Sequence, residues 1–127
     1  MGEAPAEEVI FDRDGFLNRV MGDESLARKL MNGFLADVPV QIEKLKGTIV
    51  AGDGRLAGQQ AHSIKGAAAN LGGMALQGVA FSMELAGQAG DLEALRSLLP
   101  DLQKRFAELK DTMENGDGKF QSEGRKE

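Results

Sequence analysis

The chain contains one histidine, His62, and no cysteine, so nucleophilic or metal-binding chemistry would depend on a single imidazole. Neutral imidazole is a nucleophile near physiological pH, a property that few other side chains share. Lys65 follows three residues later and would share the His62 side of a helix. An ammonium group there would lower the proton affinity of the ring and attract a negative group attached to it. A phosphoryl group on a ring nitrogen, if one were attached, would then find a nearby positive charge.

The surface around His62 on the predicted helix is made of small and polar residues. At about 100° per residue, Ile64 lies roughly 160° from His62, so the core side of this helix is nearly opposite the imidazole. A glycine in a helix interior costs about 1 kcal/mol relative to alanine, and this side contains two of them. We expect Gly66 to leave the ring clear for a partner; the alternatives are close helix packing within the fold or simple tolerance. The residues on the His62 side are Gly58, Gln59, Lys65, Gly66 and Ala69.

Other kinds of site lack the residues that they need. Only carboxylates could complete a metal site, and none lies one turn from His62. Ser63 would point about 100° away from His62, which argues against a Ser-His-Asp arrangement. The sequence has no Walker-type glycine loop and no kinase signature, so we expect no ATP-dependent self-phosphorylation. A solvated surface histidine without function remains the plain alternative for His62.

The segments between the glycine-rich breaks have apolar residues at three- and four-residue spacing, and none alternates as a half-buried strand does. Asp23, Asp53 and Asp91 each precede such a segment and are predicted helix N-caps. Pro39 and Pro100 fall inside two segments, where a proline is expected to kink a helix, and Pro39 could also break it locally. The segments with this spacing are 11–20, 23–50, 53–71, 73–89 and 91–113.

One short helix followed by four long amphipathic ones, with short connections, predicts an all-α fold. We expect an antiparallel four-helix bundle with a short extra N-terminal helix, spanning residues 10–114. The sequence before it is acidic, and the sequence after it consists of turn formers and charges around a single large apolar residue. We therefore expect residues 1–9 to be a disordered N-terminal segment and residues 115–127 a disordered C-terminal tail.

Composition limits the functional classes further. At 127 residues, 42% hydrophobic and 28% charged, the chain is typical of one compact globular domain. A net charge of −5 without a dense Lys or Arg run argues against a nucleic-acid partner. No apolar run approaches the roughly 20 residues that span a bilayer, and the acidic N-terminus is not a signal or transit peptide. We expect a cytoplasmic monomer without direct membrane insertion.

The stretch AHSIKGAAANLGG, residues 61–73, closely resembles the signature of histidine-containing phosphotransfer (HPt) domains of bacterial two-component phosphorelays. In that family the phosphorylated histidine is followed three and four residues later by Lys and Gly, which match Lys65 and Gly66. Small residues come next, followed by a hydrophobic residue and a glycine, which match Leu71 and Gly72. The family usually has a Glu or Gln on the following helix, hydrogen-bonded toward the ring, and Glu84 occupies that place. The resemblance covers residues 10–113, and its opening stretch is similar to HPt modules of hybrid sensor kinases.

This resemblance implies a phosphocarrier with His62 as the phosphoacceptor, Lys65 as a nearby cation and Glu84 orienting the ring. The ring Nε2 would attack the acyl phosphate of a receiver-domain aspartate and later return the phosphoryl group to another. The implied partners are response-regulator receiver domains, with a sensor kinase in the same or another chain as a further partner. The receiver would hold Mg²⁺, and this chain would bind no cofactor and no metal. Gly58, Gln59, Gly66 and Ala69 would line the partner surface.

Two functional alternatives remain open beside the phosphocarrier. The first is a non-catalytic helical adapter in which His62 is incidental. The second is a histidine-bearing input domain of a chemotaxis-type kinase, phosphorylated by ATP through a separate catalytic domain. Lys65 and Glu84 could likewise be solvated surface residues with no part in the reaction.

Overall fold

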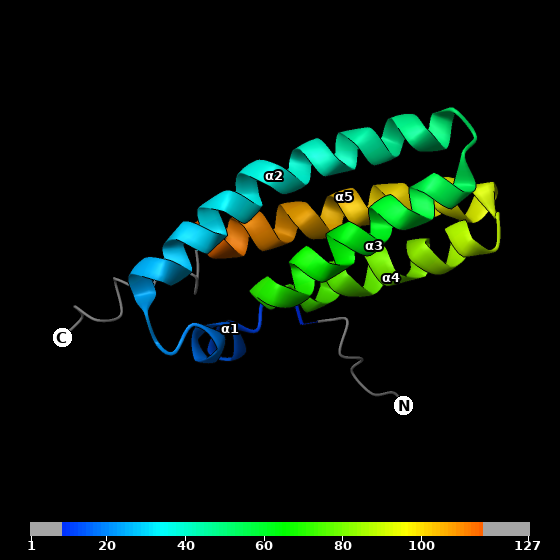
Figure 1. The fold of residues 1–127 in the computed structure, drawn as a ribbon. Helices are drawn as coiled ribbons and strands as arrows, with labels where there is room; N and C mark the ends of the chain where they lie inside the picture. Colours follow the sequence, from blue (N-terminus) through cyan, green and yellow to red (C-terminus); the bar gives the residue numbers. More distant parts are fainter. Residues whose placement is uncertain (1–8, 116–127) are drawn as a thin grey trace.

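The computed structural model describes residues 9–115, which form five helices and no strand. The connections 51–53, 72–73 and 89–91 are short, so helices that follow one another in sequence run antiparallel. Figure 1 shows four long helices side by side, with a short one at an end of the bundle. The predicted all-α four-helix bundle with a short N-terminal helix is confirmed. The helices are α1 (Arg13–Arg19), α2 (Glu24–Val50), α3 (Gly54–Leu71), α4 (Met74–Gln88) and α5 (Leu92–Asn115).

Aspartate side chains begin three of the long helices, as predicted. In Asp23, Asp53 and Asp91 the Oδ1 atom accepts a hydrogen bond from the backbone N–H three residues later, at 3.0–3.1 Å. Each bond satisfies a donor that the first turn of a helix otherwise leaves unpaired. Pro39 and Pro100 lie inside α2 and α5, and neither helix ends there. The local break considered for Pro39 therefore does not occur.

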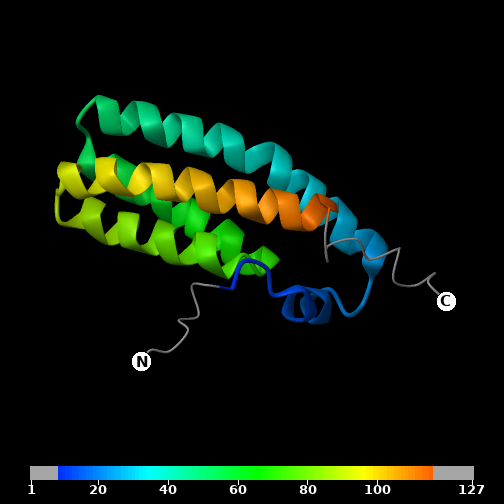
Figure 2. The same ribbon diagram turned by 180° about the vertical axis from the view of Figure 1, so that it is seen from behind.

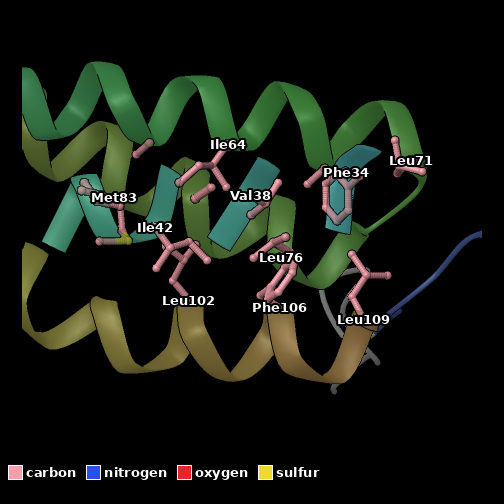
Figure 3. Close-up of a cluster of buried hydrophobic side chains, with 14 of the residues drawn as sticks. Phe34, Val38, Ile42, Ile64, Leu71, Leu76, Met83, Leu102, Phe106 and Leu109 are labelled. Carbon is pink, nitrogen blue, oxygen red and sulfur yellow. The ribbon is translucent and has the colours of Figure 1, made fainter. Parts of the chain in front are cut away.

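The core lies between the inner faces of the four long helices, where apolar side chains from all of them point toward one another (Figure 3). Among the described residues no polar or charged side chain is buried. Burying one large apolar side chain contributes about 1.5–3 kcal/mol of folding free energy, so the apolar core holds the four helices together. The labelled core residues are Phe34, Val38, Ile42, Ile64, Leu71, Leu76, Met83, Leu102, Phe106 and Leu109.

The helix α1 closes the end of the bundle at which α3 ends and α4 begins, as the view from behind in Figure 2 also shows. Arg19 donates hydrogen bonds from Nη2 to the Ala69 carbonyl at 3.1 Å and from Nε to the Asn70 carbonyl at 3.2 Å. The backbone N–H of Asp12 donates to the carbonyl of Gly72 at 2.7 Å. Gly72 has a φ of +80°, and a Cβ there would lie 2.7 Å from the Asp12 carbonyl oxygen. Both facts require glycine at this junction.

The predicted ends of the bundle need small corrections. Val9, assigned to the disordered segment 1–9, is instead held by a hydrogen bond from the Ala75 N–H to its carbonyl at 2.8 Å. Asn115, assigned to the tail 115–127, is the last residue of α5. The remainder of both predicted segments, residues 1–8 and 116–127, lies outside the described residues.

Candidate functional site

The α3 helix presents His62 to solvent. Its side chain is 63% exposed, whereas Ile64, almost opposite on the same helix, is fully buried in the core. Burial of Ile64 fixes the rotation of α3 about its own axis, and that rotation turns the imidazole outward. The accessible ring expected from the helical pattern is therefore present.

Glu84, on α4, joins His62 to Lys65. Its Oε2 atom lies 2.9 Å from His62 Nδ1, and its Oε1 atom lies 2.7 Å from Lys65 Nζ. The Glu84 side chain is only 13% exposed, so water competes weakly for both contacts. Both carboxylate oxygens are thus used to hold side chains of α3, and the three predicted residues form one cluster.

The charge on Glu84 is stabilised by this arrangement. The hydrogen bond from Lys65 is the largest cause that lowers the pKa of the Glu84 carboxyl below its ordinary value of 4.5, and the hydrogen bond from His62 acts in the same direction. Burial opposes them by raising the pKa. An ionised carboxylate only accepts hydrogen bonds, so His62 Nδ1 must carry the hydrogen that lies between them. In the neutral ring the lone pair is then on Nε2, the nitrogen free to act as a nucleophile.

Lys65 is bound more tightly than the sequence suggested. Besides the ion pair with Glu84, its Nζ lies 5.1 Å from the centroid of the Phe81 ring, within the range of a cation–π interaction. Sequence reasoning expected this ammonium group to be available to a phosphoryl group and did not identify Phe81. The signal was present, because Phe81 precedes Glu84 by three residues and so shares its side of α4. Phe81 is nevertheless 47% exposed.

The two glycines beside His62 differ in their surroundings. A Cβ at Gly66 would meet nothing within 4 Å, so this glycine faces open space, as predicted, and does not serve helix packing. Gly58 is buried, and a Cβ there would lie 3.1 Å from the Cα of Gly87 on α4. The prediction that Gly58 gives a partner room to approach is therefore corrected. Its missing side chain instead allows α3 and α4 to pack closely.

The remaining predicted residues lie on either side of His62 along α3. Gln59 is exposed and lines, together with His62 and Glu84, a groove between α3 and α4. Ala69 is half-buried two turns beyond His62, and its carbonyl accepts the hydrogen bond from Arg19. Gln59 thus shares a groove with the ring, whereas Ala69 borders the junction with α1.

Residues 9–115 contain neither a metal-binding cluster nor a membrane-spanning helix. Within this range no group of three or more His, Cys, Asp or Glu side chains is arranged to hold a metal ion. Over the same residues, every helix is either too short or too polar to cross a membrane.

The Hpt domain family matches residues 29–114 of the sequence, and the chain belongs to this family. The chain has a histidine phosphotransfer role in phosphorelays, in which HPt domains interact with response-regulator receivers and kinases. A similar solved structure is that of histidine-containing phosphotransfer protein B (HptB) from Pseudomonas aeruginosa PAO1. The two chains are 27% identical, with a TM-score of 0.72 over 85% of this chain and 90% of that one. No curated protein sequence matches the chain significantly.

Proposed function

We propose that His62 is the phosphoacceptor of this domain and that Glu84 and Lys65 prepare its ring for the reaction. The observation that carries the proposal is the 2.9 Å contact between His62 Nδ1 and Glu84 Oε2 on a ring that is 63% exposed. It assigns the hydrogen to Nδ1 and the lone pair to the outward nitrogen, Nε2. His62 is also the only histidine in the chain, so a phosphohistidine can form nowhere else.

The transfer step needs little from this chain beyond position and charge. The Nε2 lone pair attacks the phosphorus of the receiver's aspartyl phosphate, an N–P bond forms, and the P–O bond to the aspartate breaks as its carboxylate leaves. The ring gains positive charge while Nδ1 keeps its hydrogen, and the Glu84 carboxylate neutralises that charge at 2.9 Å. Return of the phosphoryl group to another aspartate reverses these steps. Mg²⁺ belongs to the receiver's half of the site.

We also propose which surface meets the receiver. Gly66 leaves open space beside His62, and Gln59 lies on the same helix. On the α4 side, Phe81 and Leu85 are 47% and 48% exposed, one helical turn apart. A standard interface buries about 800 Å² on each partner, so a receiver that reaches the ring would also cover these neighbours. Aromatic side chains are common anchors in such interfaces.

The remaining parts of the proposal concern assembly and location. We propose a monomer, because the chain's own helices surround its core and its exposed large apolar side chains are spread over several helices. We propose a cytoplasmic location, since receivers and kinases of phosphorelays would meet the chain there. Size-exclusion chromatography with light scattering tests the first statement, and fractionation of cells tests the second.

The phosphoacceptor is tested by transfer from a radiolabelled, phosphorylated receiver to wild type and to His62→Gln. Wild type should gain an acid-labile label, and His62→Gln should gain none while keeping the wild-type circular dichroism spectrum. A label on His62→Gln, or none on wild type, would contradict the proposal. If His62→Gln retains biological activity, the adapter alternative holds. Labelling by a kinase core with ATP but not by receivers would support the chemotaxis-type input domain.

A further inference from the structure

Four glycines line the contact between α3 and the end of α4 with the connection that follows it, on the side of His62 that faces the α2–α3 connection. We call this contact the glycine seam: Gly54, Gly58, Gly87 and Gly90. A Cβ on Gly87 would lie 2.6 Å from the backbone N of Gly58 and 2.7 Å from the carbonyl oxygen of Gly54. A Cβ on Gly58 would lie 3.1 Å from the Cα of Gly87. Where Gly58 meets Gly87, the two helices are therefore closer than a side chain on Gly87 would allow.

The seam lies next to the His62–Glu84 pair on both helices. Gly58 precedes His62 by one helical turn, and Gly87 follows Glu84 by three residues. The link is also direct, because a Cβ on Gly58 would lie 3.2 Å from the Glu84 carbonyl oxygen. The backbone separation at the seam thus sets how far the Glu84 carboxylate must reach to contact the ring.

We propose that the glycine seam positions Glu84 against His62, which makes Gly58 and Gly87 positioning residues for phosphoryl transfer. This inference rests on the proposed function, since it assigns those glycines a part in preparing the nucleophile. Helix interiors disfavour glycine, so at Gly58 an alanine would favour the helix itself but would press against α4. The close approach that glycine permits places the carboxylate 2.9 Å from Nδ1 and 2.7 Å from Lys65 Nζ.

The distances predict different effects for the two glycines. A Cβ on Gly87 would lie 2.6 Å from the backbone N of Gly58 and closer still to the Cα of Gly58, so it needs a shift of at least about 0.8 Å to reach an ordinary contact of 3.4 Å. If α4 moved outward by that amount, the contact of 2.9 Å between His62 Nδ1 and Glu84 would lengthen to about 3.7 Å, beyond hydrogen-bonding range. A Cβ on Gly58 needs a shift of only about 0.3 Å from 3.1 Å, which would weaken the bond without breaking it.

The experiment measures the hydrogen on the ring directly, by nitrogen NMR of His62, and so needs no phosphoryl donor. Glu84→Ala gives the reference spectrum of a ring without its acceptor. In Gly87→Ala, the fraction of His62 rings with the hydrogen on Nδ1 should fall to the value found in Glu84→Ala. In Gly58→Ala, this fraction should lie between the wild-type and Glu84→Ala values. Transfer from a phosphorylated receiver to Gly87→Ala should fall roughly tenfold or more, as expected for loss of a charge-assisted hydrogen bond.

Two control variants separate positioning from general damage. Gly47→Ala adds a Cβ that meets nothing within 4 Å, so His62 should keep its wild-type spectrum. Leu109→Val weakens the core near the opposite end of α4, where the Leu109 side chain approaches Gly73, and should lower the melting temperature without changing the tautomer. A change in the tautomer of Leu109→Val would mean that lost stability alone moves the ring, which would overturn the proposal.

A folded Gly87→Ala with the wild-type tautomer population would overturn the inference. If Gly87→Ala does not fold, the test uses Gly58→Ala instead. A wild-type spectrum of His62 in Gly58→Ala would then overturn the inference. These failures differ from failure of the proposed function. If wild type accepts the phosphoryl group but Gly87→Ala keeps its tautomer, the seam proposal alone is wrong. If wild type accepts none, the proposed function is wrong whatever the spectra show.

Discussion

The substitution Gly66→Leu should make the protein more stable and at the same time slow phosphoryl transfer from a receiver domain. A Cβ at Gly66 would meet nothing within 4 Å and Gly66 is exposed, so a side chain added there can extend into solvent. Replacing glycine in an exposed helix interior with leucine gains about 0.5–1 kcal/mol of unfolding free energy, or roughly 2–6 °C in melting temperature. On the partner side, forcing a side chain into a fitted contact costs about 1–3 kcal/mol. That cost corresponds to a roughly 5- to 150-fold loss of transfer.

The assay compares two phosphoryl donors on wild type, Gly66→Ala and Gly66→Leu. Transfer from a phosphorylated receiver should fall for Gly66→Leu and change little for Gly66→Ala. Reaction with phosphoramidate, a donor too small to be blocked, should proceed at the wild-type rate in all three. Thermal unfolding checks the expected gain in stability. Wild-type transfer from the receiver to Gly66→Leu would show that the open space beside His62 is not part of the interface.

Two further predictions concern Glu84. Because its native pKa lies below the ordinary value of 4.5, the unfolded chain binds a proton at a higher pH than the folded chain does. Its contribution to the unfolding free energy should be present above about pH 4.5 and be lost as the pH falls through the lowered pKa. Urea unfolding of wild type and Glu84→Gln measures this, and a difference independent of pH would contradict it. Phe81→Leu removes the ring under Lys65, an interaction of about 0.5–1 kcal/mol at exposed sites, and should raise the pKa of Glu84, because Lys65 would be held less firmly against the carboxylate. Carbon NMR titration of the carboxyl should show the rise, and an unchanged value would mean that Phe81 does not hold Lys65.

Local signals in the sequence were sufficient to predict the helices. Each of the N-caps Asp23, Asp53 and Asp91 accepts a hydrogen bond from the backbone N–H three residues later. The start of each of these helices therefore follows from short-range chemistry. The apolar spacing also placed the core and, with it, the outward direction of His62. The hydrogen bond that holds Val9 to Ala75 has no such local signal and was missed.

The error at Gly58 shows where a helical pattern stops being informative. At 100° per residue, Gly58 and Gly66 lie about 40° to either side of His62 around α3. They look equivalent in sequence, and only the position of α4 distinguishes the buried one from the open one. Lys65 falls about 60° from His62 on the Gly58 side, which is why it meets Glu84 on α4. The neighbour that occupies each flank is a property of the tertiary structure.

The helix α1 lies outside residues 29–114, the part of the chain that matches the family, yet it packs against the same core as the four long helices. Phe16 is 1% exposed in the shared core, and removing such a side chain typically costs about 3–5 kcal/mol. Arg19 also binds the last carbonyls of the helix that bears His62. A protein shortened to begin at residue 29 would lack these hydrogen bonds, so α3 would be open to fraying from its C-terminal end. The packed bundle therefore includes α1 and the first turn of α2, both of which lie outside the range that sequence similarity outlines.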